Sequence, residues 1–135
     1  MAPPSWNGEF EPTLPWCSVA GANIETALEI GTGDNNTKSI ISKCTDQGAE
    51  ASSAAKVASS YRGGNKADWY LPSKNELQLM FQNKNLLGKI MGIAQYWSSS
   101  QDKSLKSWAI DMETGLLTTD ENFIDRVVRP IRAFG

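Results

Sequence analysis

The spacing of the apolar residues changes once along this chain, near Gly92, and that change limits the folds open to it. Before it, Leu77, Met80 and Phe81 stand at i, i+3 and i+4, which is typical of one face of a helix. After it, apolar residues alternate with polar ones over 107–112, as in a half-buried strand. Helices followed by a run of strands predict an α+β fold, not alternating βαβ units.

Local motifs give the expected elements their bounds. Asn36 is expected to cap a helix, and Ser73 with Glu76 forms a capping box for another. Helices are therefore expected over 37–44, 49–61 and 73–83, and short strands over 24–30, 68–71, 96–100, 107–112, 115–119 and 126–129. For 135 residues this predicts a single core, with two to three helices packed on small antiparallel sheets.

The first residues are unlike the rest. Residues 1–16 hold four of the six prolines and two of the five tryptophans, which favours an extended arm over a helix. We divide the chain into this proline- and aromatic-rich arm, 1–30, and a globular unit, 31–135. The arm tryptophans, Trp6 and Trp16, are expected to contact another subunit. The remaining three are expected in the core: Trp69, Trp97 and Trp108.

Several absences narrow the function. The chain has no histidine, which excludes Ser–His and Cys–His nucleophile pairs and His-ligated zinc. It has no apolar run near 18 residues and no apolar leader at its start, so neither membrane insertion nor a signal peptide is expected. Its two cysteines, Cys17 and Cys44, form either a disulfide or a pair of buried thiols, and the sequence leaves both open. No cofactor, metal or enzymatic activity is predicted.

The net charge of −2 hides an uneven distribution. Residues 1–34 carry five acidic side chains and no basic one, whereas residues 35–135 carry all 13 basic side chains against 10 acidic ones. The second part therefore has a net charge of +3, which permits an anionic ligand.

Ordered blocks in this second part resemble the Lcl C-terminal domain family, named for a bacterial collagen-like adhesin. The blocks are Gly31-Thr32-Gly33, then DWYLPSKNEL from Asp68, YWSSS from Tyr96, and VRPIRAF from Val128. The resemblance implies a C-type-lectin-like fold and an extracellular or bacterial-surface location. It also implies binding of sulfated glycosaminoglycans and, through a collagen-like stalk, a homotrimer.

The resemblance and the basic residues together predict an adhesin domain that binds sulfated polysaccharides such as heparin, mediating attachment or aggregation, with no role for nucleic acid. Lys103 and Lys106, in a loop between two strands, are the first candidates for the site. The wider patch comprises Lys74, Lys84, Lys89 and Arg126. Salt should weaken such binding.

Three alternatives remain. A protein-binding module would use the loops 101–107 and 118–126. An oxidase like the formylglycine-generating enzyme, which shares the broad fold, would need reactive cysteines. Calcium could bind at 34–36 or 120–122, although acidic turn residues are more often only turn residues.

Overall fold

The computed structural model describes residues 2–3, 6, 12–17, 23–44, 53–86, 95–103 and 105–133. In chain order these residues form β1 (Thr13–Leu14), α1 (Gly33–Cys44), α2 (Ala54–Ser60), a 3₁₀ turn (Gly63–Asn65), α3 (Lys74–Gln82), a second 3₁₀ turn (Lys84–Leu86), β2 (Gln95–Lys103), β3 (Lys106–Asp111), β4 (Leu117–Glu121) and β5 (Arg126–Val127). The α+β class is confirmed.

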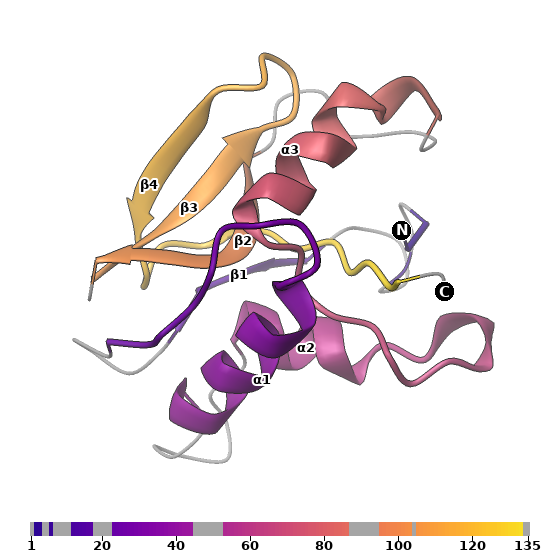
Figure 1. Cartoon of the computed structure of the whole chain (residues 1–135), viewed down its shortest axis with the longest axis horizontal. Coiled ribbons are helices and arrows are strands. Elements are labelled where there is room, and N and C mark those ends of the chain that lie inside the picture. The colour runs from indigo at the N-terminus through magenta and orange to yellow at the C-terminus, as the bar shows by residue number, and fades with distance from the viewer. Residues whose placement is uncertain are drawn as a thin grey trace.

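The strands form one five-stranded sheet in the order β1-β5-β2-β3-β4. Its neighbours are antiparallel except for β2 and β5, which run parallel at Tyr96 and Val127. The expectation of small antiparallel sheets is therefore wrong. The physical reason is the return of the chain after β4, which carries β5 from one edge of the sheet to the far side of β2. Figure 1 shows α3 against one face of this sheet and α1 with α2 against the other.

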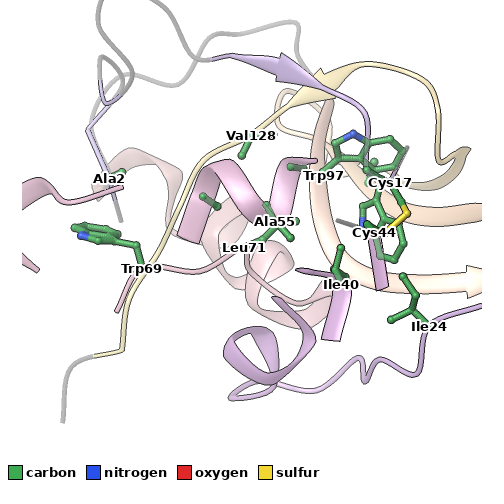
Figure 2. Close-up of a cluster of buried hydrophobic side chains, with 14 of the residues drawn as sticks. Ala2, Cys17, Ile24, Ile40, Cys44, Ala55, Trp69, Leu71, Trp97 and Val128 are labelled. Atoms are coloured by element: carbon green, nitrogen blue, oxygen red, sulfur yellow. A yellow bond between two sulfur atoms is a disulfide. The ribbon is translucent and has the colours of Figure 1, made fainter. Parts of the chain in front are cut away.

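Each face of the sheet has its own apolar core. Alternation along β3 sends Ala109 into the core beneath α1 and α2, and Ile110 into the core beneath α3. The first core contains Trp97, Leu71 and Ile40 (Figure 2). The second contains Leu77 and Met80, with Phe81 packed against them, so the predicted apolar face of α3 is confirmed.

The arm tryptophans belong to the first core. Trp16 is fully buried and Trp6 is 8% exposed, so the expectation that they contact another subunit is wrong. Both indole nitrogens donate to carbonyls of distant residues, Trp16 to Ser98 at 2.8 Å and Trp6 to Val128 at 3.0 Å. A large aromatic side chain gains most from full burial once its N–H has such a partner, and this accounts for their position.

The arm also joins the two ends of the chain. The Ala2 N–H donates to the Pro130 carbonyl at 2.9 Å, and Arg129 Nε donates to the Ala2 carbonyl at 2.8 Å. Farther along, β1 pairs with β5. The described residues of the arm thus lie on the rest of the domain, as its prolines predict.

The two cysteines form a disulfide that joins the arm to the end of α1. The Cα atoms of Cys17 and Cys44 are 5.6 Å apart, and both residues are buried in the first core (Figure 2). This settles the alternative that the sequence left open.

Four local expectations need correction. Helix α1 begins at Gly33, so Asn36 lies inside it and does not cap it. Instead, Asn36 Oδ1 accepts from the Ala27 N–H at 2.8 Å, and Asn36 Nδ2 donates to the Ala27 carbonyl at 2.7 Å. Residues 24–30 make this side-chain contact and form no strand, and 68–71 contributes only a bridge between Tyr70 and Ile131. Helix α2 begins at Ala54 with Ser53 as its cap, while 49–52 lies outside the described residues.

The predicted capping box at Ser73 is confirmed, and the carboxylate of Glu76 also accepts hydrogen bonds at the start of α1. Glu76 Oε1 accepts from the N–H groups of Ser73, at 2.8 Å, and Gly33, at 3.1 Å, while Oε2 accepts from Gly31 at 3.2 Å. One carboxylate therefore serves the starts of both α1 and α3. A Cβ on Gly33 would lie 2.8 Å from Tyr70 Cε2 and closer still to Glu76, so only glycine fits there.

This carboxylate also gives the fold a pH dependence. Burial, together with the charge of Glu76 and a hydrogen bond to it, raises the pKa of Tyr70 to about 12. The unfolded chain releases this proton near pH 10, so the stability from neutral Tyr70 is complete below pH 10 and is lost between pH 10 and about 12. We expect the free energy of unfolding of wild type to fall more steeply than that of Tyr70→Phe over this range, as measured by urea denaturation. Equal losses in the two proteins would contradict the assignment.

Candidate binding surface

The two lysines that the sequence ranked first lie side by side. Lys103 ends β2 and Lys106 begins β3, and the two are register partners across the hairpin. Both side chains are exposed. They therefore stand on paired strand ends and not on the long loop expected between two strands. Their position is better fixed than a loop would allow, because the β2–β3 ladder holds both backbones.

A third lysine shares their side of the sheet. Because side chains alternate along β3, Lys106 and Trp108 point to the face that α3 covers. Lys74, in the first turn of α3, places its Nζ 3.9 Å from the centre of the Trp108 ring. The Lys74 N–H donates to Ser100 Oγ at 2.9 Å, which fixes the start of α3 against β2. We call Lys74, Lys103 and Lys106 the lysine face.

Two of the other predicted cations, Lys84 and Arg126, do not extend this surface. Lys84 lies at the opposite end of β3, where its Nζ donates to the carbonyls of Met112, at 3.3 Å, and Glu113, at 3.1 Å. Arg126 pairs with Asp120 at 2.9 Å, and Asp120 stands opposite the buried Ser107 on the other face of the sheet. Lys89 lies outside the described residues. The structure thus brings three of the six candidates together.

Acidic residues border the lysine face. Glu121 is the register partner of Lys106 on β4, and exposed Asp102 precedes Lys103. A carboxylate opposite a lysine attracts it weakly at an exposed site, by about 0.2–1 kcal/mol. Such a pair lowers the local positive potential without immobilising the ammonium.

The two loops proposed for protein binding meet at this end of the sheet. The Asn122 N–H donates to the Leu105 carbonyl at 2.8 Å, and Ser107 Oγ donates to Asn122 Oδ1 at 2.7 Å. The contact leaves Leu105 55% exposed and Phe123 69% exposed. The sequence did not single out these two residues, although a large apolar side chain among polar loop residues is a signal that could have done so.

The remaining motifs are occupied by structural contacts. Ser98 Oγ donates to the Trp108 carbonyl at 2.7 Å, and Ser100 Oγ donates to the Ala27 carbonyl at 2.7 Å, which agrees with the expectation of hydrogen bonding for the serine run. Asp34 pairs with Lys38 and Asp120 with Arg126, so both proposed calcium loops use a carboxylate internally. Among the described residues, no three Cys, Asp or Glu side chains gather as a metal site.

The sequence matches no protein-family model and no curated protein. The resemblance to the Lcl C-terminal domain family therefore stays a prediction. Within the described part of the chain, no helix has both the length and the apolar character needed to cross a bilayer.

Proposed function

We propose that this domain binds sulfated polysaccharides through the lysine face. The observation that carries the proposal is the pairing of Lys103 with Lys106, two exposed ammonium groups held opposite each other at the end of one hairpin. Trp108 stands two positions after Lys106, about 7 Å along β3. The third charge, Lys74 Nζ, lies 3.9 Å from the centre of the Trp108 ring. A row of charges at such intervals suits a polymer with repeated sulfate groups.

The wider proposal is an extracellular or bacterial-surface adhesin with a C-type-lectin-like fold. The Cys17–Cys44 disulfide supports it, since disulfides persist mainly in oxidising compartments such as the cell exterior. Assembly as a homotrimer is part of the proposal. Three copies of a weak lysine face would bind one polymer with an avidity well above the affinity of each face.

Retention on immobilised heparin across a salt series tests the ligand. We expect wild type to be retained at low salt and released as salt rises, because exposed charges are screened over about 10 Å at 0.1 M ionic strength. The double variant Lys103→Glu/Lys106→Glu should elute at clearly lower salt. The control is Lys66→Glu, an exposed lysine beside Asp68 that follows the first 3₁₀ turn. It reverses one charge where the double variant reverses two, and it should elute close to wild type.

Two results would count against the proposal in different ways. Equal retention of the double variant and wild type would remove the lysine face as the site. Absence of retention of wild type at low salt would remove the ligand class. If the Lys66→Glu control eluted at a salt concentration as low as the double variant does, the net charge of the protein alone would account for the change in retention.

The exposed pair Leu105 and Phe123 favours a second candidate, a protein-binding module that uses the loops 101–107 and 118–126. Burial of these side chains in a contact would give salt-resistant binding and a negative heat-capacity change. The two functions therefore separate by their salt dependence.

A further inference from the structure

A cleft of about 510 Å³ is lined by residues of α1 and of the segment just before it. Figure 1 shows α1 on the side of the sheet away from α3. This volume falls within the range of small-molecule sites. The polar side chains that line it are Asn23, Glu25, Lys38, Ser39, Ser42 and Lys43. None of them belongs to the lysine face.

One wall of the cleft is the outer face of α1. Lys38 with Ser42, and Ser39 with Lys43, are two i,i+4 pairs on neighbouring rows of the helix. All four side chains therefore occupy one face within little more than one turn. They offer two ammonium groups and two hydroxyls, the first as donors and the second as both donors and acceptors.

The other wall is the extended segment 23–25. Its central residue, Ile24, is only 4% exposed and packs in the core, so its neighbours Asn23 and Glu25 are the exposed ones. They add an amide and a carboxylate to the lining. The Ile24 N–H donates to Gln101 Oε1 at 2.6 Å, which ties this wall to β2.

The two walls are also tied to each other. The paired hydrogen bonds between Asn36 and Ala27 join α1 to the opposite wall at one end of the cleft. The disulfide at Cys44 holds the other end of α1, next to Lys43. Because both walls are already fixed, a ligand does not have to order the backbone of the cleft when it binds. The entropic cost of binding is therefore small.

The charges of the lining set the kind of ligand. Two ammonium groups face one carboxylate, so an anionic group is favoured. Lys38 also lies 3.1 Å from Asp34, but these side chains are 70% and 51% exposed, and such a surface pair is weak enough for Lys38 to turn toward a ligand. The hydroxyls, the amide and the carboxylate suit several hydroxyl groups on the same molecule.

We propose that this cleft binds one anionic sugar unit. Lys38 and Lys43 hold its carboxylate or sulfate group, while Ser39, Ser42, Asn23 and Glu25 hydrogen-bond its ring hydroxyls. The proposal does not require the lysine face to bind polysaccharide, because the lysine face lies on the α3 side of the sheet and the cleft is lined by α1. Figure 1 shows these two helices on opposite sides of the sheet.

Titration of the ¹⁵N-labelled chain, followed by NMR, tests this site with three probes: glucuronate, glucose and inorganic sulfate. We expect glucuronate to shift the amide signals of the cleft residues and to bind more tightly than either of the others. Lys38→Ala/Lys43→Ala should weaken glucuronate binding about tenfold or more, since it removes two charged hydrogen bonds. Lys66→Ala should leave the affinity unchanged.

Each result of this titration either supports or overturns the binding of an anionic sugar in the cleft. Absence of shifts in the cleft, or glucuronate binding that survives Lys38→Ala/Lys43→Ala, would overturn it. Sulfate binding as tight as that of glucuronate would overturn the sugar assignment. A uronic-acid disaccharide that binds more tightly than glucuronate would identify the ligand as part of a polymer, and equal binding would identify a free sugar. If glucuronate binds while heparin retention fails, only the proposed function is lost.

Discussion

Replacement of both Cys17 and Cys44 by alanine is expected to destabilise the folded protein by about 3.5 kcal/mol. The cysteines are 27 residues apart, and in the chain-entropy model a cross-link that closes a loop of this length restricts the unfolded chain by about that amount. Loss of the buried sulfur atoms adds to this. Since a domain of this kind is stable by only about 5–15 kcal/mol, the effect is a large part of the total.

Urea denaturation with and without a reducing agent measures this contribution. Reduced wild type should unfold at a lower urea concentration than oxidised wild type, while the double alanine variant should unfold at the same concentration in both conditions. A reductant effect that persists in the alanine variant would show a cause other than this disulfide. Equal midpoints for oxidised wild type and the alanine variant would contradict the expected stabilisation.

Glu76→Ala is the single substitution for which we expect the largest loss, about 3 kcal/mol or more. The carboxylate accepts hydrogen bonds from the N–H groups of Ser73, Gly33 and Gly31. Two of these bonds are buried, and a buried donor left without a partner costs about 1–3 kcal/mol. The starts of α1 and α3 would weaken together, because both depend on one side chain.

Comparison of three variants by thermal and urea denaturation distinguishes this role from simple helix capping. Glu76→Gln keeps one oxygen acceptor and should lose less than Glu76→Ala. Asp34→Ala removes an exposed carboxylate from the first turn of α1 and should change the free energy of unfolding by less than about 0.5 kcal/mol. If Glu76→Ala cost as little as Asp34→Ala, the shared cap would not contribute to stability.

The predictions that the structure confirms rest on residues close together in sequence. The capping box at Ser73 depends on a spacing of three residues, and the β3–β4 hairpin on the turn at Gly115. The end of α3 at Asn83 and the apolar face of this helix follow from the same kind of local pattern. Interactions at this range are encoded in adjacent residues, so the sequence alone is enough to find them.

The features that the sequence could not supply are contacts between distant segments. Glu76 accepts from Gly33, 43 positions earlier, and this contact helps to place the start of α1. Asn36 was expected to cap a helix because its side chain can do so, but the backbone of Ala27 is nearer in the fold. The crossing of the chain from β4 to β5 similarly depends on the whole sheet and not on any turn residue.

For the candidate site too, some features follow from local sequence and others depend on contacts between distant segments. The sequence places Lys103 and Lys106 in one loop between two strands and so near each other, whereas their pairing as strand ends comes from the fold. The position of Lys74 above Trp108 depends on how α3 packs against the sheet, and the pairing of Arg126 with Asp120 depends on the β4–β5 connection. A list of basic residues therefore overestimates a binding patch, because folding gives some cations an internal partner.

The closeness of Ala2 to Pro130 affects how the molecule would respond to a mechanical load. Tension applied between the two ends would act first on the Ala2–Pro130 and Trp6–Val128 hydrogen bonds, and then on the short β1–β5 pairing. These contacts would break one after another, starting at the ends of the chain. Beyond them, the Cys17–Cys44 bond is covalent and carries the tension to the end of α1, so the loop that it closes cannot be stretched out.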